Sequence, residues 1–294
     1  MINQQQKQKG VVTAAYGKRY EVELLNKTRI SCVTRGKKTD LACGDVVNIR
    51  LTDKHEGVVE SNEPRTSLLY RSNAYKSKTL AANVTQAVIV LATQPSFYEA
   101  LLNRCLTAVE AAGIKPLIVL NKYDLEDTSH AKIKLEVYES LNYRTVYLSA
   151  KKDISPLLPF LRNEQSVLVG QSGMGKSTII NALLPNAAVR TQEISETLDS
   201  GKHTTTAAHL YHIDENSTLI DSPGLQEFGL NHLSQAELEH AFVEFRPFLG
   251  HCRFSDCTHQ VEPDCAIIKA TKNGDIHPTR LDFYRKLLNE ITTQ

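Results

Sequence analysis

Short stretches of alternating or β-branched apolar residues fill the first part of the chain. Between residues 10 and 64, turn residues at Gly17, Asn26, Gly36 and Gly44 separate five such stretches. Alternation of apolar and polar positions is typical of half-buried strands, and five short strands suit a small closed barrel. We therefore expect residues 10–64 to form a β-barrel of the OB type, although a five-stranded SH3-like barrel would give the same pattern.

Longer apolar runs, separated by helical patterns, begin at residue 84. Residues 84–92 are almost continuously apolar, as in a strand that is buried on both faces. Further strands are expected at 117–120, 145–148, 167–169 and 218–220, with helices between them. This alternation of strand and helix predicts an α/β domain with a mostly parallel sheet.

Helical patterns dominate the C-terminal part of the chain, over residues 225–250 and 279–292. Ser96 with Glu99, and Ser234 with Glu237, have the spacing of capping boxes, which begin helices. The patterns together divide the chain into a disordered tail at 1–9, the barrel at 10–64, a basic linker at 65–83, the α/β domain at 84–226 and a helical domain at 227–294.

Composition and charge narrow the class of protein. The chain is 41% hydrophobic and 23% charged, which is ordinary for a soluble globular protein. It contains neither a membrane-spanning apolar run nor a signal-peptide pattern, so we expect a cytoplasmic protein. Its net charge of +1 hides an asymmetry, because residues 1–80 contain 15 Lys and Arg against 8 Asp and Glu. This basic first part favours an acidic polymer such as nucleic acid as a partner, although a solvated basic surface would also explain it.

One glycine-rich segment, G-Q-S-G-M-G-K-S, has the spacing of a phosphate-binding loop. Its glycines allow backbone N–H groups to turn inward around phosphates at the start of a helix. Lys176 is expected to lie between the β- and γ-phosphates, and Ser177 to offer a hydroxyl to Mg²⁺. The nucleotide-binding residues expected here are Gly170, Gln171, Ser172, Gly173, Met174, Gly175, Lys176, Ser177 and Thr178.

Two further motifs predict that the nucleotide is GTP or GDP. Asn121, Lys122 and Asp124 form N-K-x-D, in which the carboxylate accepts the two donors that guanine has and adenine lacks. Ser149, Ala150 and Lys151 follow the next expected strand and fit the loop whose alanine N–H contacts the guanine O6. Every such motif follows a strand, where open parallel sheets bind ligands.

Between the phosphate loop and a D-x-x-G element lies G-K-H-T-T-T, at residues 201–206. Asp221 is expected to bind Mg²⁺ through water, Gly224 to sense the γ-phosphate, and Thr205 or a neighbouring threonine to complete the Mg²⁺ shell. Leu225 stands where many GTPases carry a water-orienting glutamine. An apolar residue cannot orient water, so His203 is the candidate for this catalytic role, the alternative being a flexible surface histidine.

The guanine-reading motif precedes the phosphate loop, whereas the usual GTPase order is the reverse. The chain is therefore predicted to be a circularly permuted GTPase, which keeps its site because only the spatial positions of the strand-end loops matter. The segment after D-x-x-G then leads directly into the C-terminal domain, so nucleotide state is expected to influence that domain.

Cys252, Cys257, His259 and Cys265 provide three thiols and one imidazole within 14 residues. A Cys₃His set is typical of a closed, structural zinc site. The alternative is a group of reduced cysteines in a small helical cap. His251 is also adjacent, but the spacing favours His259.

The barrel, the permuted motifs and the Cys-x4-Cys-x-His-x5-Cys cluster together resemble the ribosome small-subunit-dependent GTPase A family, also called RsgA or YjeQ. The resemblance covers nearly the whole chain. It implies a bacterial factor for late maturation of the small ribosomal subunit, with slow GTP hydrolysis that the subunit stimulates. It also implies that the OB and zinc domains contact ribosomal RNA, and that His203 is the proposed catalytic group.

Two functions remain open at this point. The first is an enzyme, expected to be monomeric, that docks on the small subunit with GTP bound and leaves after hydrolysis to GDP. The second is an RNA-binding assembly protein that uses GTP only as a structural ligand, and GTP turnover distinguishes the two. A P-loop kinase is disfavoured because N-K-x-D and D-x-x-G belong to GTPases.

Overall fold

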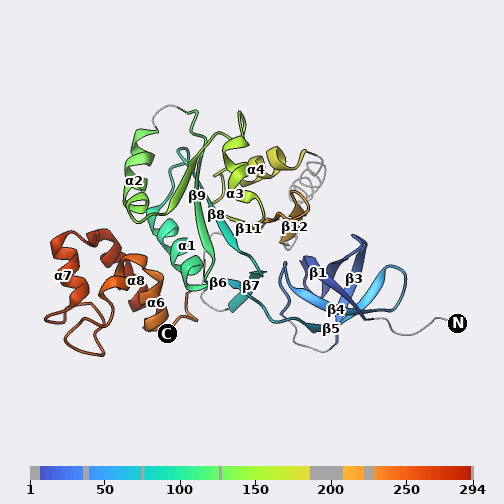
Figure 1. Ribbon diagram of the computed structural model, residues 1–294, viewed down its shortest axis with the longest axis horizontal. Helices are drawn as coiled ribbons and strands as arrows, with labels where there is room; N and C mark the ends of the chain where they lie inside the picture. Colours follow the sequence, from blue (N-terminus) through green and yellow to red (C-terminus); the bar gives the residue numbers. More distant parts are fainter. Residues whose placement is uncertain are drawn as a thin grey trace.

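The computed structural model describes residues 7–35, 40–73, 76–125, 128–185, 208–221, 228 and 230–292, with the backbone alone for 71–73 and 76–78. A β-barrel, an α/β domain and a helical C-terminal region follow one another along the chain, as Figure 1 shows. This is the multi-domain architecture that the sequence predicts. None of the helices in the described ranges is long and apolar enough to cross a membrane.

Five strands close into the N-terminal barrel. They are β1 (Lys7–Tyr16), β2 (Arg19–Leu24), β3 (Arg29–Thr34), β4 (Val46–Leu51) and β5 (Glu56–Asn62). The barrel closes because β1 pairs with both β2 and β4, while β5 pairs with β4 and, in parallel, with β3. These contacts between non-consecutive strands are the Greek-key order of the OB type, which the sequence favoured.

The segment that the sequence suggested as a basic linker contains a two-stranded hairpin, β6 (Leu68–Asn73) and β7 (Lys76–Ala82). Its base is attached to the barrel by Arg65, whose guanidinium donates to both carboxylate oxygens of the fully buried Asp45 at 2.7 Å. The backbone N–H of Ala82 donates to the carbonyl of Cys43 at 2.9 Å. The described residues at the base of the hairpin are therefore bonded to the barrel at both ends.

The α/β domain is built on β8 (Gln86–Ala92), β9 (Lys115–Asn121), β10 (Arg144–Tyr147), β11 (Gln165–Val169), β12 (His209–His212) and β13 (Thr218–Asp221). The strand order is β10-β9-β8-β11-β13-β12, and only β12 runs antiparallel to its neighbour β13. Helices α1 (Glu99–Ala111) and α2 (Ser129–Ser140) lie on one side of the sheet. Helices α3 (Leu158–Leu161) and α4 (Lys176–Leu183), with the 3₁₀ turn Ser155–Leu157, lie on the other (Figure 1).

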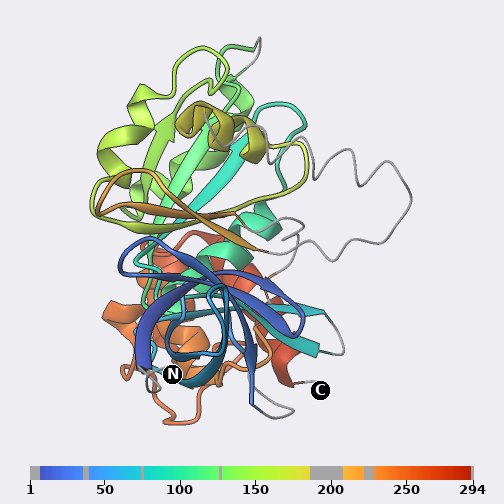
Figure 2. The ribbon, with the colours of Figure 1, turned by 90° about the vertical axis from the view of Figure 1, so that its right-hand side faces the viewer.

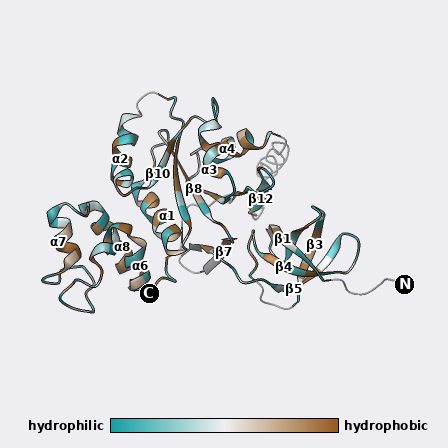
Figure 3. Cartoon of the chain, viewed as in Figure 1, coloured by the Kyte–Doolittle hydropathy of each residue, from teal (hydrophilic) through white to brown (hydrophobic). Residues whose placement is uncertain are grey.

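Helices on both faces explain the continuous apolar strands. Every residue of β8 is buried, and Figure 3 shows the hydrophobic ribbon of this central strand. Strands buried on both faces have no solvent side to carry polar residues, so the apolar pattern is nearly uninterrupted.

The barrel and the sheet meet at β12, the strand that directly follows the expected first switch. Ala14 of β1 pairs with His209 of β12, which joins the barrel strands and the sheet into one eleven-stranded array. Nε2 of His212 also lies 2.7 Å from a carboxylate oxygen of Glu23 on β2. Figure 2 shows the blue barrel strands lying against this edge of the sheet.

The C-terminal region contains α6 (Gln235–Ala241), a 3₁₀ helix (Val243–Phe248), α7 (Ala266–Asn273) and α8 (Pro278–Thr292). The capping box of Ser234 and Glu237 is confirmed, with both reciprocal hydrogen bonds present. The box predicted from Ser96 and Glu99 is wrong, because α1 begins only at Glu99 and has no side-chain cap. Phe97 is buried immediately before that helix, so the chain turns into the core between the serine and the first helical residue.

A buried ion pair holds the C-terminal region against α1. Arg280 of α8 is 1% exposed and donates to the carboxylate of Glu244 at 2.6 Å. The same guanidinium donates to the side-chain oxygen of Asn103 on α1, also at 2.6 Å. Breaking these contacts would leave a buried charge without its partners, which is costly. They therefore hold α8 and α1 in a fixed relation.

Candidate nucleotide site and metal cluster

The predicted nucleotide-binding residues meet at one edge of the sheet. Asn121 is the last residue of β9 and Asp221 the last residue of β13, while Gly170 directly follows β11. Since β9, β8, β11 and β13 run in parallel, their carboxyl ends lie on the same side. Ser149 follows β10, which pairs in parallel with β9, so this residue lies at the same edge. Motifs that are far apart in the sequence therefore meet at the carboxyl ends of the parallel strands, where such sheets bind ligands.

Backbone conformation explains the glycines of the phosphate loop. Gly170 and Gly175 have φ values of 145° and 94°, which other residues rarely adopt. A Cβ atom on Gly170 would lie 2.3 Å from the carbonyl oxygen of Val90, and one on Gly175 would lie 2.3 Å from Nδ2 of Asn121. The loop therefore packs directly on β8 and on the N-K-x-D motif.

Lys176, the first residue of α4, points back into this loop. Its ammonium donates to the carbonyls of Gly170 at 2.6 Å and Gln171 at 2.8 Å. Burial lowers the pKa of Lys176, and the nearby Asp221 acts in the opposite direction. The cation thus lies within the loop, at the N-terminus of a helix, where anions bind favourably.

Asn121 ties three of the motifs together. Its Nδ2 donates to the carbonyl of Met174 in the phosphate loop at 3.0 Å. Its Oδ1 accepts the backbone N–H of Ala150, from the Ser-Ala-Lys loop, at 3.0 Å. The side chain is 2% exposed, so both hydrogen bonds are shielded from water. The sequence suggested that this asparagine ties neighbouring loops, and these two hydrogen bonds do so. The expected contact of the Ala150 N–H with the guanine O6 stays a prediction.

The other two residues of N-K-x-D also have defined partners. Lys122 adopts a positive φ of 60°, and its ammonium donates to the carbonyls of Gln94 at 2.6 Å and Gly173 at 2.7 Å. A hydrogen bond from Ser149 and the charge of Lys152 hold the pKa of Asp124 below its usual range. Sequence reasoning missed Gln94 and Lys152, since neither belongs to a motif.

Several predicted residues lie outside the described part of the chain. They are His203, Thr204, Thr205, Thr206, Gly224 and Leu225. The water-positioning role of His203 and the choice of threonine for Mg²⁺ therefore stay predictions. Ser177 and Asp221, the other residues expected at Mg²⁺, lie at the nucleotide edge of the sheet.

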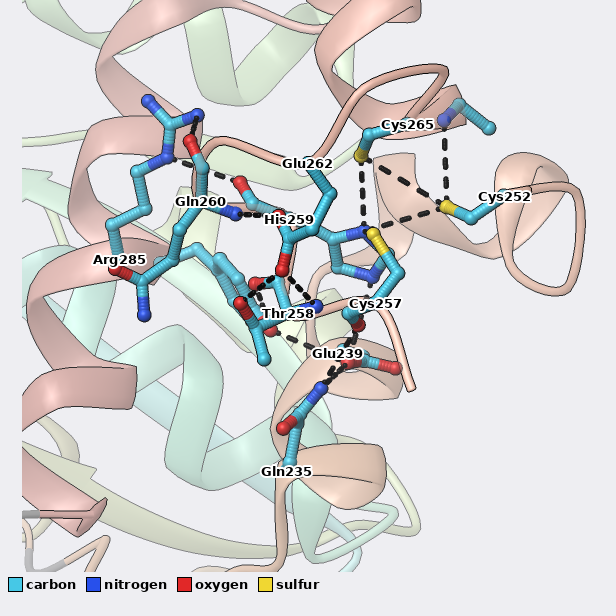
Figure 4. A network of polar contacts seen from close by, with 12 residues as sticks. Gln235, Glu239, Cys252, Cys257, Thr258, His259, Gln260, Glu262, Cys265 and Arg285 are labelled. Atoms are coloured by element: carbon cyan, nitrogen blue, oxygen red, sulfur yellow. Dashed lines mark hydrogen bonds and ion pairs between the residues drawn. The ribbon is translucent and has the colours of Figure 1, made fainter. Parts of the chain in front are cut away.

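The four predicted metal ligands form one cluster, which Figure 4 shows from close by. The ligand atoms of Cys252, Cys257, His259 and Cys265 all lie within 4.8 Å of one another. The three sulfur atoms lie 3.3 to 3.6 Å from Nδ1 of His259, and those of Cys252 and Cys265 are 3.9 Å apart. His251 is not part of this cluster.

These distances suit a tetrahedral zinc site. Bond lengths of about 2.3 Å to sulfur and about 2.0 Å to nitrogen imply tetrahedral edges of about 3.8 Å between sulfurs and about 3.5 Å between sulfur and nitrogen. Burial raises the pKa of the thiols of Cys257 and Cys265, so their thiolate forms need a compensating cation. The N–H of Ile268, at the start of α7, also donates to the sulfur of Cys265 at 3.5 Å.

A carboxylate behind the cluster was not found from the sequence. Oε1 of Glu239, on α6, lies 3.5 Å from Nε2 of His259, on the ring edge opposite the sulfur atoms. Gln235 donates to the same oxygen at 2.7 Å, as Figure 4 shows. The hydroxyl of Tyr284 also donates to it, at 3.3 Å. A carboxylate in this position fixes the orientation of a metal-binding imidazole. No spacing rule connects Glu239 to the cysteines, so only the fold brings it there.

Comparisons with known proteins agree with this geometry. The family model described as RsgA GTPase matches residues 62–231. The small ribosomal subunit biogenesis GTPase RsgA of Nitrosospira multiformis is 49% identical over 286 residues, which cover 97% of this chain and 91% of that protein. The protein of the same name from Neisseria gonorrhoeae is 49% identical over 280 residues, or 95% of this chain and 91% of the relative.

Two solved structures share the fold over almost the whole chain. YjeQ from Thermotoga maritima superposes with a TM-score of 0.77 at 29% identity, covering 98% of this chain and 100% of that one. YloQ, described as a circularly permuted GTPase, superposes with a TM-score of 0.73 at 27% identity, covering 100% and 98%.

Proposed function

This chain belongs to the RsgA GTPase family, and on that premise we propose that it hydrolyses GTP on the small ribosomal subunit during the late maturation of that subunit. Hydrolysis is stimulated by the subunit and coupled to release of the protein. The observation that best supports a guanine-nucleotide switch is the position of Asn121, which joins the phosphate loop to two loops of the guanine side. The names of the relatives support the small subunit as the partner.

In this proposal the phosphate loop and Lys176 hold the phosphates, and Asp124 reads the guanine. Lys122 covers the base, while the N–H groups around Ala150 and Lys151 face its O6. Mg²⁺ would be held by Ser177, Asp221 and Thr205, and it supplies positive charge to the phosphates. Gly224 senses the γ-phosphate, and His203 positions the attacking water.

We assign a structural zinc ion to Cys252, Cys257, His259 and Cys265. All four positions of a tetrahedral shell are then protein ligands, which leaves none for a substrate. The barrel and the C-terminal domain are the proposed contacts to ribosomal RNA. The protein acts as a monomer in the cytoplasm, where the subunit matures.

GTP turnover with and without purified small ribosomal subunits tests the proposal, with large subunits as the control. We expect strong stimulation by the small subunit alone. GTP binding without any stimulation would contradict the proposal and favour an RNA-binding assembly protein that keeps GTP as a structural ligand.

A further inference from the structure

A cleft of about 540 Å³ lies where the phosphate loop, α1 and α8 meet. The phosphate loop contributes Gln171 and Ser172, and α1 contributes Leu101 and Arg104. Phe283, Lys286 and Glu290 recur at helical spacing along α8 and form the opposite wall. Ligand-binding clefts typically enclose about 300–1,000 Å³, so the size suits one ligand unit of moderate size.

The two helical walls are held at a fixed distance. Arg280, one turn before Phe283, is bound to Asn103, which precedes Arg104 in α1. Arg104 also pairs with Glu290 across the cleft. The cleft is thus bounded by elements that are bonded to one another and not by a loose contact between domains.

Two side chains in the cleft, Lys286 and Tyr98, define what would bind there. Lys286 is exposed and forms no ion pair or hydrogen bond within the described part of the chain, so it offers a free cation. Glu290 and Arg104 neutralise each other, so Lys286 makes the cleft positive overall. Tyr98 also lines the cleft and is 69% exposed.

Together Lys286 and Tyr98 suit a ligand with an anionic group next to a flat face. A nucleotide residue of RNA carries both, as phosphate and base. Exposed aromatic rings stack on bases without regard to sequence, and lysine binds the backbone phosphate. The apolar sides of Leu101 and Phe283 complete a floor for the base.

We propose that this cleft binds one unstacked nucleotide of the ribosomal RNA, with Tyr98 stacking on the base and Lys286 binding the phosphate. The proposal deepens the function proposed above and rests on it for the identity of the RNA. Because Gln171 and Ser172 belong to the phosphate loop, the bound nucleotide touches the GTP site and the C-terminal region at once. Docking of RNA at this point is therefore a direct route by which the subunit stimulates hydrolysis.

Photo-crosslinking tests the occupant. The full-length protein with p-benzoylphenylalanine in place of Tyr98 is irradiated on purified small subunits, and separately with a ten-nucleotide single-stranded RNA containing 4-thiouridine. We expect an adduct with RNA in both cases, and Lys286→Ala should weaken the oligonucleotide adduct about fivefold. An adduct with a ribosomal protein, or no adduct, overturns the proposal.

Hydrolysis rates test the consequence. Tyr98→Ala and Lys286→Ala should lower subunit-stimulated turnover about five- to tenfold and leave intrinsic turnover unchanged. Tyr98→Phe should retain the stimulation because it retains the stacking ring, and Lys132→Ala, at an exposed position of α2, serves as the matched lysine control. Unchanged stimulation in both alanine variants overturns the proposal while the GTPase function stands. If subunits do not stimulate the wild type, the proposed function fails, and the oligonucleotide adduct still decides whether the cleft binds RNA.

Discussion

Nδ2 of Asn121 donates to the carbonyl oxygen of Met174 at 3.0 Å, although 53 residues separate the two in the chain. The same Nδ2 lies against Gly175, where a Cβ atom would be only 2.3 Å from it, so the N-K-x-D motif packs directly on the phosphate loop. The motif proposed to recognise the base and the loop proposed to bind the phosphates thus share one side chain. The nucleotide site is a single unit, even though circular permutation has reversed the order of its two main motifs.

Replacing Asn121 should therefore damage both functions of the site. Asn121→Ala removes two buried hydrogen bonds and leaves the Met174 carbonyl and the Ala150 N–H unpaired, at a cost of about 1–3 kcal/mol. We expect GTP affinity to fall about 5- to 150-fold, with a smaller preference for GTP over ATP. Titration calorimetry with both nucleotides measures this, with Asn216→Ala in an exposed loop as the control. Undiminished guanine preference would exclude the role given to Asn121.

His203 should matter for hydrolysis and not for binding. If it positions water, His203→Ala should reduce subunit-stimulated turnover about 100-fold or more and leave GTP affinity unchanged. Single-turnover assays with labelled GTP separate the two effects, and His130→Ala on α2 is the matched surface control. A stimulated rate equal to that of the wild type would remove His203 from the mechanism.

Glu239 should strengthen zinc binding without touching the metal. Its carboxylate lies 3.5 Å from Nε2 of His259, so Glu239→Ala leaves the imidazole without its orienting partner. Loss of such a partner typically weakens metal binding about 10- to 100-fold. Competition with a chromophoric zinc chelator measures the affinity, and Glu215→Ala in a distant loop is the control. Equal affinities in both variants would show that the contact has no effect on the metal.

Glu164 should make stability depend on pH in the acid range. Burial alone would raise its pKa, but Lys115, at 2.8 Å, and Thr85 lower the pKa below its usual 4.5. A lowered pKa stabilises the folded state above the unfolded pKa, and this contribution is lost as pH falls below about 4.5. Glu164→Gln should destabilise the protein by about 0.5–1 kcal/mol at pH 7 and less at pH 3.

Chemical denaturation of Glu164→Gln and wild type at the two pH values measures the difference. Glu56→Gln, at the exposed first residue of β5, is the control and should show no pH-dependent difference. A destabilisation of Glu164→Gln that is the same at pH 3 as at pH 7 would mean that the ion pair with Lys115 contributes nothing.

The amino-acid sequence predicted several features whose interacting groups are close in the chain. Ser234 and Glu237 form their predicted capping box because both belong to one helical turn. The glycines of the phosphate loop and the spacing of the four metal ligands are equally local, since backbone conformation and short loops decide them. Apolar runs such as β8 also predicted a sheet covered on both faces, because burial depends on the residues of the strand itself.

The tertiary structure decided every contact between distant segments. The pairing of β1 with β12, the attachment of Arg65 to Asp45 and the approach of Glu239 to His259 leave no periodic signal in the chain. Tertiary packing also overrode a local pattern at Ser96 and Glu99. Their spacing predicted a capping box, but Phe97 is buried in the core and α1 begins at Glu99 without a side-chain cap. The physical reason is that a local pattern specifies which groups need partners, whereas the packing of the whole chain selects the partners.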